Sequence, residues 1–336
     1  MKKFLALIIA VVLAVSGLSV ISITANAATI FISGNYEYTV NSDDTVNIAG
    51  YKGIATDITI PSQILNKNVV KISDNSFYNN STLTSVKIPN TIKVVGSMAF
   101  HNCTKLSKVT LPSNLTEIGY NAFEGTTALT TITIPKTVTT AGNNVFNGSA
   151  LKTATIENGA TAVADNLFSN AKNLTKVTIP NTVKKIGSMS FYDCTKLSSV
   201  TLPNTLTSIE TSAFKNCQAM KSITIPKSVT YFGTTAVGYS DGRVIDGFII
   251  YGYKNTKAQT YATKNKITFK ALQEETVPVG DINNDGKIDV SDVTYLQMYL
   301  SGNSSYVIKN TKAADANGDG KIDVADVTKI QTIIAS

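Results

Sequence analysis

The sequence predicts a mainly β solenoid built from repeats of about 23 residues, followed by a small all-α domain. A proline preceded by Ile or Leu recurs every 23 residues, apart from one interval of 45 in which Glu157 takes the proline position of a 22-residue repeat. A phenylalanine recurs with the same period, and two aspartate-rich loops of one pattern follow the repeats. Such a sustained period is typical of a solenoid, in which stacked turns share one core. The recurring residues are Pro89, Pro112, Pro135, Pro180, Pro203 and Pro226, with Phe77, Phe100, Phe123, Phe146, Phe168, Phe191 and Phe214.

Residues 1–27 have the pattern of a secretory signal peptide. Lys2 and Lys3 precede an apolar run over residues 4–20, and Ala25-Asn26-Ala27 gives a small-x-small cleavage site. The alternative is a membrane anchor, but Gly17 and several serines dilute the apolar run. We therefore expect a secreted, extracellular protein with no membrane span after signal cleavage.

The composition argues against nucleic-acid binding and against catalysis. The 336-residue chain has a net charge of +7, of which Lys2 and Lys3 contribute two, and the positive charge is spread along the repeats without a basic run. The single histidine, His101, follows Phe100 in a variable column that we expect to face solvent. No two carboxylates of the repeats share a turn in a way that indicates acid–base chemistry. The sequence therefore predicts that the chain is not an enzyme.

The repeats have one local pattern. In each, a short strand with alternating apolar residues, such as Leu83, Val86 and Ile88, ends at the proline, which cannot donate a hydrogen bond to the sheet. A glycine then recurs at one turn position, and the phenylalanine follows on a short helical or irregular segment and fills the core. Before the repeats, residues 28–55 are expected to form a β cap, with a hairpin whose strands lie on either side of residues 42–45.

The consensus Leu-x-x-Ile-x-Ile-Pro-x-x-Val-x-x-Ile-Gly-x-x-Ala-Phe resembles the BspA-type leucine-rich repeats of bacterial surface and secreted proteins. The resemblance covers about residues 56–272, and residues 247–272 are similar to the strand–helix–strand cap that closes such arrays. It implies a leucine-rich repeat solenoid that serves as an adhesion or interaction module.

The outward strand positions of the repeats form two hydroxyl-rich columns. They are either a flat face for a glycan, a partner protein or ice, or a solvated strand face to which threonine is suited by its β-propensity. We favour the second interpretation, because sugar-binding faces usually carry aromatic platforms and the 14 tyrosines concentrate in the caps and the C-terminal region. The columns are Lys87, Thr110, Thr133, Thr155, Thr178, Thr201 and Thr224, and Ser85, Lys108, Thr131, Thr153, Lys176, Ser199 and Ser222.

Cys103, Cys194 and Cys217 occupy the same position of three repeats. We expect buried free thiols that act as small apolar residues. A disulfide is the alternative for Cys194 and Cys217, because consecutive turns bring their Cα atoms to ~5 Å. A zinc site is disfavoured, since no CxxC pair or nearby histidine completes a ligand set.

The two loops that follow a short linker at residues 273–279 have the spacing of Ca²⁺-binding loops. Oxygen donors stand at positions 1, 3, 5, 9 and 12, a lysine offers its backbone carbonyl at position 7, and glycine at position 6 allows a sharp turn. Four carboxylates crowded into one loop would repel one another without a cation. The sequence therefore predicts two Ca²⁺ ions, bound by Asp281, Asn283, Asp285, Lys287, Asp289 and Asp292 and by Asp315, Asn317, Asp319, Lys321, Asp323 and Asp326.

Each loop leads into a helix, expected at residues 290–300 and 324–335, and no helix is expected before either loop. The apolar residues Val293, Leu296 and Leu300, and Val327, Ile330 and Ile334, give each helix one core face. This duplicated loop–helix unit, with Asp at position 12, resembles the type I dockerin over residues 280–336. The resemblance implies binding to a cohesin domain of a scaffoldin, with the partner-reading positions at Val290, Ser291, Gln297 and Met298 and at Val324, Ala325, Gln331 and Thr332.

Together these features predict a secreted, non-catalytic component of a cellulosome-like complex in polysaccharide catabolism. Its dockerin would bind a scaffoldin cohesin in a calcium-dependent way and hold the protein in a cellulosome or at the cell surface. Its solenoid would serve as a protein or glycan interaction surface, for adhesion among other roles. The alternative is an enzyme of polysaccharide breakdown, of glycoside hydrolase type, with an unrecognised site in the repeats.

Overall fold

The computed structural model describes residues 29–273 and 278–336. The predicted signal peptide, residues 1–27, lies outside these residues, and so does the centre of the predicted linker. Contacts divide the chain into two units with a boundary between Leu272 and Gln273, and each unit is described by itself. In neither described range does a helix combine the length and the apolar character that crossing a membrane requires.

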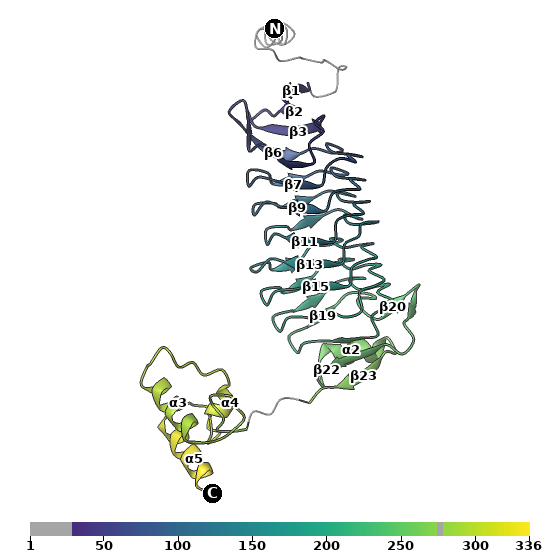
Figure 1. The fold of residues 1–336 in the computed structure, drawn as a ribbon. Coiled ribbons are helices and arrows are strands. Elements are labelled where there is room, and N and C mark those ends of the chain that lie inside the picture. The colour runs from purple at the N-terminus through teal and green to yellow at the C-terminus, as the bar shows by residue number, and fades with distance from the viewer. Residues whose placement is uncertain (1–28, 274–277) are drawn as a thin grey trace. The chain divides into compact units, whose positions relative to one another are not determined.

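The first unit is a parallel β solenoid of about 10 turns, which confirms the predicted fold class (Figure 1). Strands of successive turns pair one repeat apart: Ser85 pairs with Lys108, 23 residues later. In the shorter repeat, Thr131 pairs with Thr153, 22 residues later. The sequence period is therefore the period of the turns.

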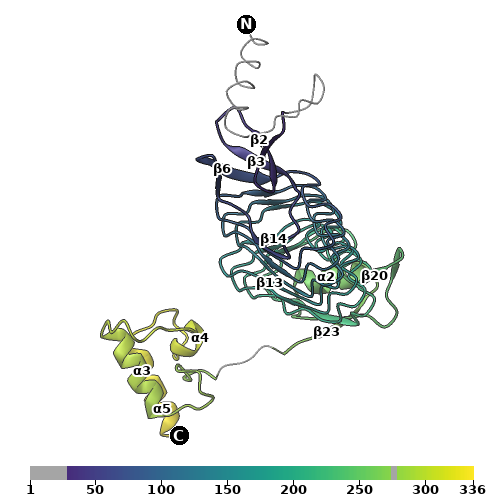
Figure 2. The same cartoon turned by 45° about the horizontal axis from the view of Figure 1, so that its top comes forward.

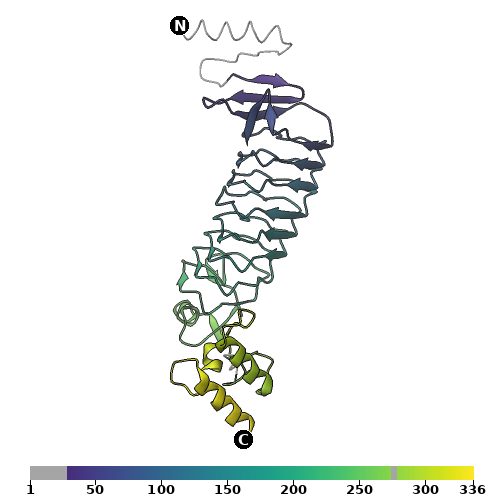
Figure 3. The same ribbon diagram turned by 90° about the vertical axis from the view of Figure 1, so that its left-hand side faces the viewer.

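Two columns of short strands run along the solenoid, and Figure 3 shows the strands of the first column one after another along one side of the stack. The first column contains β4 (Asp57–Thr59), β7 (Ser85–Lys87), β9 (Lys108–Thr110), β11 (Thr131–Ile134), β13 (Thr153–Ile156), β15 (Lys176–Thr178), β18 (Ser222–Thr224), β22 (Ile249–Gly252) and β23 (Thr268–Ala271). The second contains β6 (Lys67–Ile72), β8 (Val94–Val95), β10 (Glu117–Ile118), β12 (Thr140–Ala141), β14 (Ala162–Val163), β16 (Lys185–Ile186), β17 (Ser208–Ile209) and β19 (Tyr231–Phe232).

The first column is divided into three sheets, β4–β7–β9, β11–β13–β15 and β18–β22–β23. One division lies between β9 and β11, which belong to adjacent turns. At the other, the segment that contains Ser199 and Thr201 is not a strand, although the repeat pattern predicts one there. The two outward columns are therefore interrupted rather than continuous.

Short elements close both ends of the solenoid. At the N-terminal end, β1 (Phe31–Ser33), β2 (Tyr36–Val40) and β3 (Val46–Tyr51) form an antiparallel meander that contains the predicted hairpin, and β3 pairs in parallel with β6. The hairpin of β5 (Gln63–Ile64) with β6 is an addition that the sequence pattern does not predict. At the other end, β22, helix α2 (Lys257–Lys264) and β23 have the expected strand–helix–strand order. The hairpin of β20 (Tyr239–Ser240) and β21 (Arg243–Val244) precedes them.

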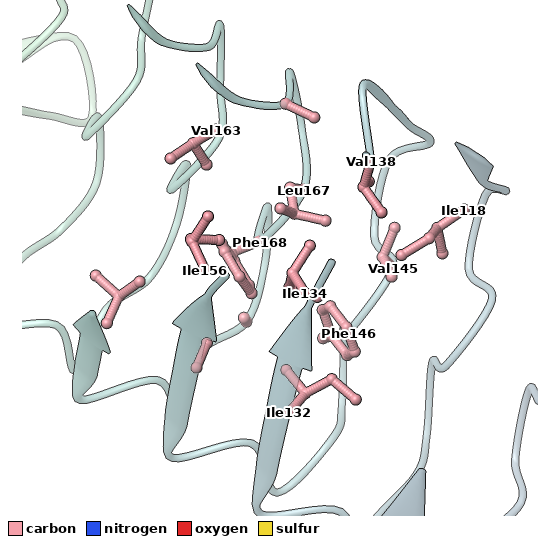
Figure 4. Close-up of a cluster of buried hydrophobic side chains, with 14 of the residues drawn as sticks. Ile118, Ile132, Ile134, Val138, Val145, Phe146, Ile156, Val163, Leu167 and Phe168 are labelled. Atoms are coloured by element: carbon pink, nitrogen blue, oxygen red, sulfur yellow. The ribbon is translucent and has the colours of Figure 1, made fainter. Parts of the chain in front are cut away.

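The predicted phenylalanine column fills the core of the solenoid. All seven side chains are buried, and neighbouring rings stack with centroids between 4.9 and 5.8 Å apart. Figure 4 shows Phe146 and Phe168 among the buried Ile, Val and Leu side chains of their turns. Tyr51 stacks on Phe77 at 5.4 Å, so the aromatic column continues into the N-terminal cap. Each such pair adds about 0.5–1.5 kcal/mol to the stabilisation from burial.

The recurring glycine allows consecutive turns to approach each other closely. A Cβ atom on Gly119 would lie 2.4 Å from the backbone nitrogen of Ser97, and one on Gly142 would lie 2.4 Å from that of Tyr120. A side chain at Gly119 or Gly142 would therefore require the two turns to shift apart locally, whereas Ala164 and Glu210 stand at the same repeat position of other turns.

The three cysteines are buried free thiols, as expected, and Cys194 and Cys217 do not form the alternative disulfide. Each Sγ donates a hydrogen bond to the carbonyl oxygen of a core phenylalanine in the preceding turn, at 3.1 Å for Cys103 and Cys194 and 3.2 Å for Cys217. Burial raises the pKa of Cys103 and of Cys217 to about 12, and raises the pKa of Cys194 in the same direction.

We expect none of the three thiols to react with iodoacetamide in the folded protein at about pH 8. The thiolate is the reactive form, and a raised pKa keeps each thiol protonated. Mass spectrometry after alkylation should find no adduct on the native protein and an adduct on all three cysteines after denaturation. An adduct on native Cys194 or Cys217 would show that the turns around them open.

The second unit is a small all-α domain with its own core. Its helices are α3 (Val290–Leu300), α4 (Thr311–Ala314) and α5 (Val324–Ile334), and α3 packs against α5 (Figure 2). The expected core residues Val293, Leu296, Val327 and Ile330 are buried. Ile334 is exposed, contrary to expectation, because α5 ends at this residue.

The expectation that no helix precedes either loop is wrong for the second loop. The one-turn helix α4 ends directly before Asp315, and Asn310 caps it by accepting hydrogen bonds from the backbone N–H groups of Lys312 and Ala313. Ala313 and Ala314 of this turn are buried, so α4 contributes to the core of the unit.

Candidate functional site

The first aspartate-rich loop is a tight turn organised around Asp281. Its buried carboxylate accepts hydrogen bonds from the backbone N–H groups of Asp285 (3.1 Å) and Gly286 (3.0 Å). The side-chain oxygen of Asn283 accepts a second bond from the N–H of Asp285, at 2.9 Å. Gly286 has a φ of +86°, in the left-handed region that glycine adopts without steric cost. The chain therefore turns sharply at position 6 and folds back over the carboxylate at position 1.

The second loop repeats this arrangement. The carboxylate of Asp315 accepts hydrogen bonds from the N–H groups of Asp319 (3.0 Å) and Gly320 (2.9 Å), and Gly320 has a φ of +84°. Asn317 also accepts a hydrogen bond from Asp319, at 2.9 Å. Two loops 34 residues apart in the sequence thus have the same hydrogen bonds at corresponding positions.

The last two acidic positions of each loop cap the helix that follows. Asp289 accepts a hydrogen bond from the N–H of Ser291 (2.8 Å), and buried Asp292 accepts one from the N–H of Asp289 (3.0 Å). This reciprocal pair is a capping box, and Asp323 and Asp326 form the same pair at the start of α5. Positions 9 and 12 therefore join each loop to its helix.

Asp292 also connects the end of the first loop to its beginning. One carboxylate oxygen accepts hydrogen bonds from the N–H groups of Ile282 (2.7 Å) and Asn283 (3.1 Å). Asp326 accepts a corresponding bond from Asn317 at 3.1 Å. Because the carboxylate must stay close to these backbone groups, the short side chain of Asp suits position 12.

The donor set of both loops fits a hard divalent cation. Carboxylate, amide and carbonyl oxygens are the ligands that Ca²⁺ prefers, and each loop supplies them in the required order. Hydrogen bonds from Ser291 lower the pKa of Asp289, and those from Lys321 and Asn317 lower the pKa of Asp319, so both carboxylates stay ionised at neutral pH. Over the described ranges, however, no three His, Cys, Asp or Glu side chains converge as closely as a metal ion would hold them. The coordination of the ion, including the backbone carbonyls of Lys287 and Lys321, stays a prediction.

The eight residues predicted to read a cohesin are all exposed. In each helix the second pair follows the first by seven residues, which is about two helical turns, so all four lie on one side of the helix. Val290 and Val324 have 70% and 69% of their surface exposed. Apolar residues exposed at corresponding positions of two helices are typical of a protein-binding surface. The eight residues are Val290, Ser291, Gln297 and Met298 on α3, and Val324, Ala325, Gln331 and Thr332 on α5.

The two helices differ at one of these positions. The hydroxyl of Ser291 donates to the carboxylate of Asp289 at 2.6 Å and lies 2.9 Å from the side-chain nitrogen of Asn283. Ala325, its counterpart on α5, has no side-chain donor. The first loop is therefore joined by side-chain hydrogen bonds to Ser291, one of the residues predicted to read a cohesin, and the second loop has no such bonds at Ala325.

On the solenoid, a groove of about 560 Å³ lies where the sheet is divided between β9 and β11. Hydroxyl groups of both outward columns line it, with Lys108 and Glu157. Sequence reasoning did not select Glu157 as a site residue, although its place in the proline column marked it as unusual. Its carboxylate accepts a hydrogen bond from the backbone N–H of Lys136 at 2.9 Å.

Comparison with known protein families assigns both units. Residues 54–175 and 161–241 match the BspA type Leucine rich repeat region in six copies, and residues 279–334 match the Dockerin type I domain. The chain belongs to the BspA-type leucine-rich repeat family. It carries a type I dockerin domain, a module that binds calcium, at its C-terminal end.

One solved structure supports the leucine-rich repeat fold, and two others are similar to the chain. A leucine-rich repeat protein from Bacteroides ovatus is 25% identical, with a TM-score of 0.51, over 72% of this chain and 67% of that protein. The leucine-rich repeat protein TpLRR from T. pallidum is 26% identical over 70% of this chain and 95% of its own, with a TM-score of 0.47. A leucine rich cell surface protein from Faecalibacterium prausnitzii is 24% identical over 75% and 97%, with a TM-score of 0.44. No curated protein matches the chain.

The expectation that His101 faces solvent is wrong, because the side chain lies between neighbouring turns of the leucine-rich repeats. Its ring stacks on Tyr78 with centroids 4.9 Å apart, and its Nε2 lies 3.5 Å from a carboxylate oxygen of Glu124. The expectation failed because the column is variable in sequence yet half-buried between neighbouring turns. These contacts give His101 a packing role in the repeat array.

Proposed function

We propose that the protein is a secreted, non-catalytic component of a cellulosome-like complex. Its dockerin binds two Ca²⁺ ions and a cohesin of a scaffoldin, and this attachment holds the protein in a cellulosome or at the cell surface. The observation that carries the proposal is the duplicated loop–helix unit, which presents eight exposed residues at corresponding positions of α3 and α5. The match to the dockerin type I domain supports the choice of partner.

The solenoid is the part that this attachment would deliver. The groove between β9 and β11 offers hydroxyl groups, Lys108 and Glu157 for polar contacts with a protein or glycan. The outward strand face adds further hydroxyl groups and lysines. Both matched modules are non-catalytic, which favours an interaction role in polysaccharide catabolism over a hydrolase.

The double substitution Val290→Asp with Val324→Asp should weaken cohesin binding by roughly tenfold or more, because it places charge at the centre of an apolar contact. The measurement is the dissociation constant for immobilised type I cohesin modules in calcium and in chelator. Val307→Asp is the matched control, since Val307 is exposed in the same unit but lies outside the predicted face. Equal losses of affinity in both variants would refute this role for the two valines. Binding that persists in chelator would refute the calcium-dependent attachment.

A further inference from the structure

A second groove of the leucine-rich repeat unit lies in the C-terminal cap, between β19 and helix α2, and has a volume of about 410 Å³. This volume is within the usual range of ligand sites. The groove combines aromatic rings with lysines and contains no acidic residue in its lining. Its chemistry therefore differs from that of the hydroxyl-rich groove between β9 and β11. The main lining side chains are Tyr231, Phe232, Tyr239, Lys257, Tyr261 and Lys264.

The floor of this cap groove is fixed by packing and hydrogen bonds. The rings of Phe232 and Tyr261 stack with centroids 4.6 Å apart. The hydroxyl of Tyr261 donates to the backbone carbonyl of Val237 at 3.2 Å, and the hydroxyl of Tyr239 donates to Asn265 at 2.7 Å. A ligand would therefore meet a surface that is already organised, which lowers the entropic cost of binding.

The charge of the groove comes from helix α2. Lys257 and Lys264 are exposed and lie seven residues apart, so they project from the same side of the helix about 10 Å apart along its axis. The helix sequence KAQTYATK has no acidic residue. In the part of the chain that the structure describes, neither lysine forms an ion pair, and Glu210 of the preceding turn is outside the lining. Two ammonium groups thus face the groove without a carboxylate partner.

Tyr231 supplies an aromatic platform beside these lysines. Half of its surface (51%) is exposed, although it stands on strand β19 in register with Ser208 of the preceding turn. Thr234 and Thr260 add hydroxyl groups to the rim. A flat ring next to hydroxyls suits the apolar face and the hydroxyl groups of a pyranose ring, and the lysines suit carboxylates attached to that ring.

We infer that the cap groove binds an acidic oligosaccharide containing uronic acids. A linear uronate chain repeats its carboxylates at regular intervals, so one chain can reach both Lys257 and Lys264, whereas a single carboxylate reaches only one. An acidic peptide is disfavoured, because β19 has only two residues and offers too short an edge for strand addition. This inference goes beyond the proposed attachment to a scaffoldin and uses no residue of the dockerin.

The test is a calorimetric titration of the full-length mature chain with a galacturonate oligomer, in calcium and again in chelator. Binding should occur in both buffers and should weaken as salt is added, because exposed charges are screened. Lys257→Ala with Lys264→Ala should lower the affinity roughly tenfold, and Tyr231→Ala should lower it further. Lys270→Ala is the matched control, since Lys270 is an exposed lysine of the same cap outside the groove and should bind as the unchanged protein does.

Three results would overturn the inference. The methyl-esterified oligomer has the same sugar without the charge, and equal binding of both forms would exclude recognition of the carboxylates. Equal binding of poly-glutamate would show a general anion surface rather than a glycan site. No binding of the galacturonate oligomer would remove the proposal itself. We expect cohesin capture to be lost in chelator and glycan binding to persist there. Failure of one proposal is therefore distinguishable from failure of the other.

Discussion

Chelation of calcium is expected to unfold residues 280–336 and to leave the solenoid folded. Each loop has four carboxylates within twelve residues of sequence, and the described part of this unit has only eight buried apolar residues. Domains this small gain little stability from their core alone. A ligand that binds only the folded state adds about 4 kcal/mol at a thousandfold excess over its dissociation constant, which is comparable with the whole stability of such a domain.

Differential scanning calorimetry of the full chain should therefore show two transitions in calcium and one in chelator. The variant Asp281→Ala with Asp315→Ala should behave in calcium as the unchanged protein does in chelator, because it removes the first predicted ligand of both loops. The solenoid transition is the internal control and should stay at the same temperature. Loss of both transitions, or of neither, would show that calcium does not act through these two loops.

Phe146→Ala should lower the free energy of unfolding of the solenoid by about 3–5 kcal/mol. The ring of Phe146 is fully buried and stacks between those of Phe123 and Phe168, at 5.7 and 5.8 Å. Its loss leaves a cavity and breaks the aromatic column in the middle of the array. Since each turn contacts mainly its neighbours, the damage should be local and should separate the array into two parts that unfold less cooperatively.

Denaturant unfolding monitored by far-UV circular dichroism measures this loss. Tyr120→Ala is the control, because Tyr120 is an aromatic residue of the preceding turn with 59% of its surface exposed, and surface substitutions usually change stability by less than about 0.5 kcal/mol. Phe146→Leu keeps most of the buried volume and should cost less than the alanine variant. Equal effects of Phe146→Ala and Tyr120→Ala would mean that the column does not stabilise the array.

The repeat period and the loop spacing carry most of what the sequence can predict about this fold. A solenoid translates period into structure directly, because a residue such as Phe100 must stack on Phe77 and Phe123 once the turns are in register. The same is true within a loop, where the hydrogen bond from the N–H of Gly286 to the carboxylate of Asp281 spans only five residues of chain. Burial of the cysteines follows for the same reason, since they share one repeat position.

Features that depend on contacts between variable positions of neighbouring repeats, or on a cap, were not predictable from the pattern. The half-burial of His101 depends on Tyr78 and Glu124 in the adjacent turns, and the division of the sheet between β9 and β11 has no counterpart in the consensus. The left-handed backbone falls largely on asparagines, such as Asn79 and Asn102, rather than on the recurring glycine. The cap groove joins Tyr231 to a helix more than twenty residues later, and only the cap brings them together.

Because strands pair one repeat apart, each repeat adds the same length to the solenoid. Each repeat is one complete turn and advances the stack by roughly 4.8 Å, so the four steps from β11 to β18 span about 19 Å. Deleting or duplicating one 23-residue repeat would change the distance between the two grooves by about 4.8 Å and would add or remove the small rotation that one turn contributes. The spacing between surfaces on this protein can therefore be changed by whole repeats, without redesign of the core that holds them.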